Sequence, residues 1–84
     1  MAKTIFTGAN LAVVQVVRQA RVNAGLTRRQ LAERIGRDQS HISIIENSQR
    51  RLDVVEFIRI ARALGRDPVD LFTEVVRAAI AAEP

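Results

Sequence analysis

The amino-acid sequence predicts an all-α fold of five helices, and three observations support this prediction. Apolar residues recur every three or four positions rather than every second, which is the spacing of a buried helix face. Proline occurs only at positions 68 and 84, so most of the chain is free to be helical. Helix-starting threonine and aspartate residues, and helix-stopping glycines, divide the chain into segments of helical length. The 84 residues suit one domain, 1–84, without an internal repeat or linker.

The first helix is expected to begin between Thr7 and Asn10 and to stop at Gly25. Its apolar stripe consists of Val13, Val17, Ala20 and Ala24. The preceding stretch KTIFT, residues 3–7, could pair as a short extended arm, but threonine and isoleucine alone are weak grounds for a strand. No other segment reads as a strand.

The next two predicted helices are short and close together in the sequence. Thr27 followed by Gln30 is a capping box, in which the hydroxyl and the side-chain amide each satisfy a free backbone N–H at the helix start. Gly36 is expected to end this second helix in a left-handed conformation. Asp38 then caps a third helix that runs to about Asn47.

The last two predicted helices are also bounded by clear signals. Asp53 with Glu56 opens a fourth helix, VVEFIRIARAL, which stops at Gly65. Asp67 as cap and Pro68 at the first helical position open a fifth helix. This helix runs almost to the end of the chain.

The net charge of +4 is distributed unevenly along the chain. Residues 18–51 hold eight arginines against three acidic residues, whereas residues 52–84 hold four arginines against six. A basic middle beside an acidic C-terminal part suggests one face for a polyanion. A solvated basic surface is the alternative, and charge alone does not decide between them.

The composition limits the chemistry that the protein can carry out and indicates the cellular compartment in which it works. With no cysteine and one histidine, the chain has neither disulfides nor a ligand cluster for a structural metal, so we expect no metal and no cofactor. No segment is long enough to span a membrane, and a reducing, cytoplasmic compartment is expected. His41 and Ser43 are two residues apart and point away from each other on a helix. With no other catalytic pattern, we expect no enzyme activity.

Residues 27–47 predict a helix-turn-helix, because two short helices are joined by about three residues around Gly36. Four apolar residues would lock the pair onto a core: Leu31, Ile35, Ile42 and Ile45. Such a unit presents the outer face of its second helix to a groove about as wide as a helix.

Residues 25–72, GLTRRQLAERIGRDQSHISIIENSQRRLDVVEFIRIARALGRDPVDLF, resemble the phage repressor/Cro-type (XRE-like) helix-turn-helix family. The resemblance covers more than half the chain and implies a compact five-helix repressor-like domain. It also implies a sequence-specific transcriptional regulator, which we expect to be a repressor that binds double-stranded DNA at a palindromic operator as a homodimer.

The family reads bases with the start of the third helix, which here supplies Gln39, Ser40, Ser43 and Ile44. Glutamine suits a bidentate pair with adenine, and serine suits several bases. The family often has a long polar or basic residue where this chain has Ile44. An apolar side chain there can meet a thymine methyl, and its polar neighbours favour this interpretation. The alternative is that Ile44 is merely exposed, as many single apolar residues are.

Two further roles follow from the resemblance. The residues expected to contact phosphate are Thr27, Arg28, Asn47, Gln49, Arg50 and Arg51. Such contacts set affinity and register rather than sequence, and Arg28 replaces the glutamine that is usual in the family. The family also pairs an arginine of the first helix with the glutamate that ends the third, here Arg21 and Glu46, so Glu46 is interpreted as a scaffold residue.

The C-terminal helix, residues 67–83, is longer than a small core requires, which suggests a dimer contact. The residues assigned to that contact are Val75, Val76, Ala79 and Ile80. Simple closure of the core is the alternative. A different function also stays open, namely a protein-interaction module, an antitoxin or adaptor, that holds another protein with its first and fifth helices. A non-specific DNA packager is disfavoured, because it would carry lysine and arginine at positions 39, 40 and 43.

Overall fold

The computed structural model describes residues 8–83, which form five α-helices and no strand. The helices are α1 (Ala9–Asn23), α2 (Arg28–Arg34), α3 (Gln39–Glu46), α4 (Val54–Ala63) and α5 (Pro68–Ala82). The predicted all-α class is confirmed. The stretch KTIFT lies outside the described residues. Within 8–83, none of the helices combines the length and the apolar character that crossing a membrane requires.

Side-chain caps begin four of the helices. In the Thr27–Gln30 capping box, the Thr27 hydroxyl oxygen accepts from the Gln30 backbone N–H at 3.1 Å, and Gln30 Oε1 accepts from the Thr27 backbone N–H at 2.9 Å. Aspartates cap the next three helices: Asp38, Asp53 and Asp67. Gly36 follows α2 with a φ of 71°, a left-handed conformation that side chains with a Cβ rarely adopt. Local signals therefore set the short turn between α2 and α3.

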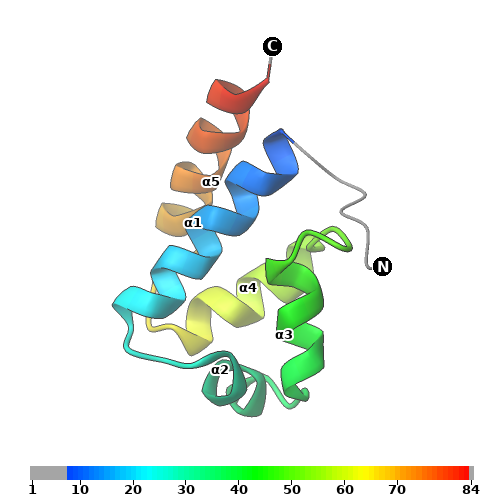
Figure 1. The fold of residues 1–84 in the computed structure, drawn as a ribbon. Helices are drawn as coiled ribbons and strands as arrows, with labels where there is room; N and C mark the ends of the chain where they lie inside the picture. The colour runs from blue at the N-terminus through cyan, green and yellow to red at the C-terminus, as the bar shows by residue number, and fades with distance from the viewer. Residues whose placement is uncertain (1–7, 84) are drawn as a thin grey trace.

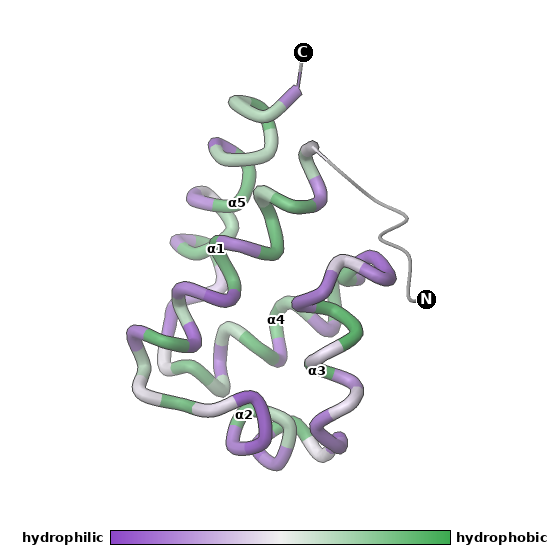
Figure 2. Tube along the Cα trace, viewed as in Figure 1, coloured by the Kyte–Doolittle hydropathy of each residue, from purple (hydrophilic) through white to green (hydrophobic). Residues whose placement is uncertain are grey.

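The helices pack in two groups around one core. α1 and α5 lie side by side and antiparallel, whereas α2, α3 and α4 form the other half of the molecule (Figure 1). Hydrophilic and hydrophobic residues alternate along the trace of each helix (Figure 2), so that each contributes a buried face. The buried cluster comprises Val17, Ala20, Leu31, Ala32, Ile42, Ile45, Phe57, Ile60, Ala61, Leu64, Leu71 and Val75. Ile35 packs at its edge, and Ala24 of the predicted stripe is exposed.

α5 closes the core with one face and leaves apolar surface on another. Leu71 and Val75 are buried, but Phe72 is 47% exposed and Ile80 is 69% exposed. The Phe72 ring meets Phe57 edge-on, with the ring centroids 5.6 Å apart. Val75 therefore has little surface for the dimer contact assigned to it, because it packs inside the cluster. Apolar surface remains at the half-buried Val76 and at Ile80.

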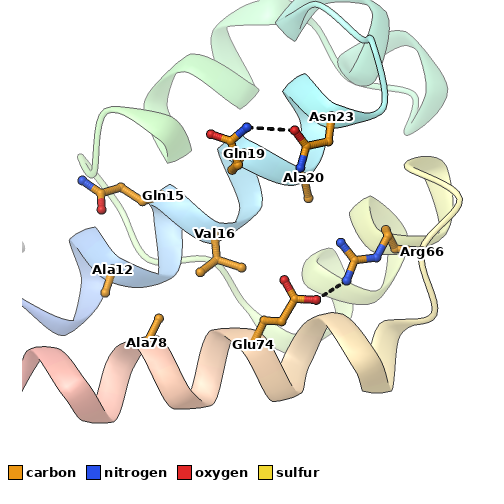
Figure 3. Close-up of a pocket in the computed structure, with 9 residues that line it drawn as sticks. All are labelled: Ala12, Gln15, Val16, Gln19, Ala20, Asn23, Arg66, Glu74 and Ala78. Carbon is orange, nitrogen blue, oxygen red and sulfur yellow. Dashed lines mark hydrogen bonds and ion pairs between the residues drawn. The ribbon is translucent and has the colours of Figure 1, made fainter.

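A groove of about 300 Å³ runs between α1 and α5 (Figure 3). Small residues on facing helices, such as Ala12 and Ala78, leave this space. Four of the polar side chains along it form two pairs: Gln19 donates to Asn23 Oδ1 at 2.9 Å, and Arg66 pairs with Glu74. The groove is thus a gap between helices with short side chains, bordered by paired polar groups.

Candidate nucleic-acid interface

α3 turns one face to the core and the other to solvent. Ile42 and Ile45 are buried, and both belong to the core cluster. The four predicted base-contacting residues lie on the opposite side: Gln39, Ser40 and Ile44 are exposed, and Ser43 is half-buried. At about 100° per residue, these positions share one broad face of the helix. The structure therefore brings the four side chains onto a single surface.

Ile44 is 38% exposed and is absent from the core cluster. Its neighbours on the outer face of α3 are hydroxyl and amide side chains, so it makes a small apolar point in a polar surface. Its methyl groups are accessible to a molecule bound at this surface. This is the geometric condition that a thymine-methyl contact requires.

Ser40 also takes part in the start of α3. Its hydroxyl donates to Asp38 Oδ1 at 2.5 Å, and the His41 backbone N–H donates to the same oxygen at 3.2 Å. The Ser40 hydroxyl, followed by the His41 backbone N–H, lowers the pKa of the Asp38 carboxyl below its ordinary value. Asp38 therefore stays ionised at neutral pH as the cap of α3, and Ser40 oxygen is left to accept from a base.

The predicted pair of Arg21 and Glu46 is present, and it is part of a larger network. Arg21 Nε donates to Glu46 Oε2 at 2.7 Å, and Arg21 Nη2 donates to Oε1 at 3.0 Å. Arg21 Nη1 donates to the Leu26 carbonyl at 2.8 Å. Arg28 Nε also donates to Glu46 Oε1 at 3.0 Å. The Glu46 carboxylate thus joins α3 to α1 and α2, and Arg21 also holds the loop that follows α1.

Because this network is buried, its hydrogen bonds contribute to the stability of the fold. The Glu46 side chain is 1% exposed and that of Arg21 is 9% exposed, so neither charge can be satisfied by water. Glu46 ends α3, where the helix dipole disfavours an acidic residue, and Arg28 begins α2, where it disfavours a basic one. The Glu46 and Arg28 side chains are therefore each stabilised by the opposite charge on the other helix. The scaffold role predicted for Glu46 agrees with this geometry.

Arg28 also binds Glu46 within the fold, a role that the sequence did not predict. Its Nε is bound to Glu46, whereas the prediction gave it only a phosphate contact. The side chain is still 34% exposed, at the N-terminus of α2. Thr27 beside it is exposed, and its hydroxyl oxygen serves the capping box. The hydrogen of that hydroxyl remains available to a phosphate.

Arg50 is held within the protein by a cluster at the start of α4. Its Nη2 donates to Glu56 Oε2 at 2.8 Å and lies 3.2 Å from His41 Nε2. Its Nη1 donates to the Arg51 carbonyl at 3.0 Å. His41 pairs with the same Glu56 oxygen. Arg50 thus braces the loop after α3 against α4, and Glu56 offsets part of its charge.

The loop after α3 contains a further constraint. Ser48 is fully buried with a φ of 56°, which is unusual for a residue other than glycine. Asn10 of α1 donates its side-chain N–H to the Ser48 hydroxyl at 2.6 Å. Asn47 and Arg51 are exposed on either side of this anchor, and Gln49 is half-buried. The usual glycine or asparagine signal for this conformation is missing, so the sequence did not reveal it.

Arginines from two other segments lie beside α3, because Arg28 at the start of α2 bonds to Glu46 and Arg50 of the following loop lies 3.2 Å from His41. Exposed Thr27 precedes Arg28 in the chain, and exposed Arg51 follows Arg50. In residues 8–83, no three histidine, aspartate or glutamate side chains lie together as a metal site would require. The surface has the chemistry of a contact with a polyanion, with hydrogen-bonding side chains at its centre.

The sequence and the fold of this chain are similar to those of known proteins. The profile of a family described as a helix-turn-helix domain matches residues 12–72, which is more than half of the chain. An XRE-family-like protein from Pseudomonas syringae pv. tomato str. DC3000 is 40% identical in sequence, with a TM-score of 0.76 over 82% of this chain and 84% of that one. The chain belongs to the XRE family of helix-turn-helix proteins. The predicted resemblance is thereby confirmed.

The family is one of DNA-binding helix-turn-helix regulators of transcription. An uncharacterized HTH-type transcriptional regulator from Methanothermobacter thermautotrophicus is 36% identical over 55 residues, which cover 66% of this chain and 80% of that protein. The restriction-modification controller protein C.Esp1396I, as a tetramer in complex with its natural 35-base-pair operator, has the same fold. Its TM-score is 0.78 at 24% identity, over 89% of this chain and 99% of that one.

Loss of Arg21 should destabilise the fold, because Glu46 would stay buried with Arg28 as its remaining partner. Arg21→Ala is expected to lower the free energy of unfolding by about 3 kcal/mol in urea denaturation. The control is Arg29→Ala, which removes an exposed pair with Glu33 at 3.7 Å and should cost less than about 0.5 kcal/mol. Equal costs for the two variants would refute the structural role of the network.

Proposed function

We propose that this protein is a sequence-specific transcriptional repressor that binds double-stranded DNA at a palindromic operator as a homodimer. The outer face of α3 is the observation that carries the proposal. It presents Gln39, Ser40, Ser43 and Ile44 together on a helix whose opposite face is locked into the core. The major groove of B-DNA admits such a helix and offers donors, acceptors and thymine methyls to it. Membership of the XRE family supports the same function.

Each residue of the proposed reading surface has a chemical role. Gln39 donates and accepts in a bidentate pair with adenine, and the serines bond to several bases. Ile44 packs against a thymine methyl. At the edges, Thr27, Arg28 and the first backbone N–H groups of α2 hold one phosphate, since a helix N-terminus attracts anions. Asn47, Gln49, Arg50 and Arg51 hold the opposite strand, with Arg50 shared between Glu56 and the phosphate.

The proposed dimer uses the apolar surface left on α5. A groove of about 340 Å³ lies between α4, α5 and the start of α1, and Phe72, Val76, Ala79 and Ile80 line its α5 side. Burying these side chains in a second copy would remove apolar surface from water. A two-fold dimer would set its two copies of α3 about 34–36 Å apart, on successive turns of the major groove. The tetramer of C.Esp1396I on its operator is an assembly of the same fold.

The alternative function, an antitoxin or adaptor that holds another protein, draws on exposed apolar residues of α1 and α5. Leu11 is 38% exposed and Val22 is 46% exposed, outside the face that α1 turns to the core. Selection of binding sites from random duplex DNA distinguishes the two functions. Enrichment of a palindromic sequence supports the regulator, whereas no enrichment above background supports the protein-binding module.

Ile44→Ala should weaken operator binding without destabilising the fold, because the side chain is outside the core. A contact of this size is worth about 1–2 kcal/mol by area, and a mismatched base pair costs about 1–3 kcal/mol. Operators with uracil in place of the contacted thymine lack only the methyl group. They should reproduce much of the loss with the parent protein and cost little more with Ile44→Ala.

Thermal unfolding and gel-shift titration together test this assignment. Ile42→Ala is the matched control, since it truncates a buried isoleucine of the same helix and should lower the melting temperature by many degrees. If Ile44→Ala also melts early, or if uracil costs the variant as much as the parent, Ile44 does not contact thymine.

Ile80→Glu should convert the dimer into a monomer, because it places a charge in the apolar contact proposed on α5. Sedimentation equilibrium of the full chain at micromolar concentration gives the mass directly. Ala81→Glu introduces the same charge at the next exposed position and should leave the dimer intact. A parent protein that stays monomeric at high micromolar concentration would rule out the α5 dimer.

A further inference from the structure

The outward face of α4 takes no part in the fold or in the proposed DNA and dimer contacts. Its four residues are Val55, Ile58, Arg59 and Arg62, and all are exposed. Their spacing places them on one side of the helix, opposite the buried Phe57, Ile60 and Ala61. Val55 is 59% exposed and Ile58 is 40% exposed. The face therefore mixes aliphatic and basic side chains and contains no acidic residue.

A furrow runs beside this face, between α4 and the turn that joins α2 to α3. It consists of two adjoining hollows of about 500 and 100 Å³, which share Ile35 and Arg59 in their linings. Arg34 and Arg62 line the larger hollow, and Arg37 lines the smaller one. The furrow thus brings arginines from α2, the turn and α4 around an aliphatic floor that includes Ile35.

The arginines of this furrow are not paired with acidic side chains within residues 8–83. None of Arg34, Arg37, Arg59 and Arg62 forms an ion pair with a described carboxylate. Arg34 Nη1 donates to the Ala63 carbonyl at 2.9 Å, which fixes that guanidinium at the wall of the larger hollow. Asp53 and Glu56 line only the smaller hollow, at the end near His41. The larger hollow is therefore lined by three arginines and no acidic residue, which favours a negatively charged ligand.

We propose that this face of α4, with its furrow, binds an acidic segment of another protein that carries aliphatic side chains among its carboxylates. The guanidinium group of arginine forms paired hydrogen bonds with a carboxylate. Val55 and Ile58 would pack against the aliphatic residues of the segment. A DNA backbone would satisfy the arginines but would leave these two side chains without an apolar partner. The mixture of charge and exposed aliphatic surface therefore favours a protein over a second DNA duplex.

This second binding surface goes beyond the proposed function, because it is separate from the outer face of α3 that would contact DNA bases. None of the four residues on the outward face of α4 is among the residues assigned to bases, phosphates or the dimer. A segment bound there would leave the outer face of α3 free. Such a surface would allow the regulator to recruit, or to be controlled by, an acidic partner while it occupies DNA.

Selection from a library of random peptides tests this binding surface. Peptides of about 16 residues, long enough for about four helical turns, are selected on the full-length parent protein. Enriched peptides should combine aspartate or glutamate with leucine, isoleucine or valine. Their binding should weaken at least about tenfold on Arg59→Glu/Arg62→Glu, because like charges would then oppose each other. Ile58→Ser should weaken it as well.

The control variant is Arg18→Glu/Arg77→Glu, which makes the same change in charge at exposed arginines of α1 and α5. It should bind the enriched peptides as the parent does. Arg59→Ala/Arg62→Ala, which adds no repulsion, provides a second test if the charge reversal impairs folding. Thermal unfolding by circular dichroism checks that each variant is folded. Amide shifts in NMR spectra should change along α4 when a peptide binds.

Three results would overturn the proposal. The first is that the enriched peptides are not acidic, or that they bind the α4 variants and the parent equally. The second is that Arg59→Glu/Arg62→Glu lowers the salt dependence of duplex binding by about 0.9 in log–log slope for each lost contact, which would assign the face to DNA. The third is that the same variant abolishes self-association, which would assign the face to a second copy.

Discussion

The buried carboxylate of Glu46 is the constraint on which the arrangement of the helices depends. It receives three hydrogen bonds from two arginines, and these arginines come from α1 and from the start of α2. Since Glu46 ends α3, the network fixes the orientation of that helix against both neighbours. Arg21 also holds the Leu26 carbonyl, so the loop between α1 and α2 is part of the same unit. An apolar core alone tolerates small rotations of a helix, whereas paired hydrogen bonds to a carboxylate tolerate few.

Local chemistry explains why so much of the fold could be predicted from the sequence. Thr27 and three aspartates start helices, and Gly36 turns the chain, through contacts within a few residues. The contacts that were missed join residues from different elements, at separations from six residues to 38. Arg28 shares Glu46, His41 and Arg50 share Glu56, and Asn10 binds Ser48. The burial of Val75 was not predicted, because helical spacing shows an apolar face but not which part of it the neighbouring helix covers.

Three surfaces of this small domain differ in chemistry. The outer face of α3 is polar with one apolar point, α5 carries a mainly apolar strip, and the outward face of α4 mixes arginine with aliphatic side chains. The residues that face inward hold these surfaces in fixed relation, because all five helices contribute to one core. A domain of this size can therefore offer separate contacts to separate partners.

The separation between the Glu46 network and the outer face of α3 has an evolutionary consequence. The Glu46 carboxylate and Arg21 are buried at the end of α3, whereas Gln39, Ser40 and Ile44 are exposed and Ser43 is half-buried. None of those four side chains bonds to Glu46 or to its arginines, and Ser40 alone among them bonds to a cap of α3. Under the proposed function, substitutions at the exposed positions 39 and 44 would therefore change DNA preference at little cost in folding. Descendants of one such gene would then diverge in the sites they bind while they keep the same scaffold.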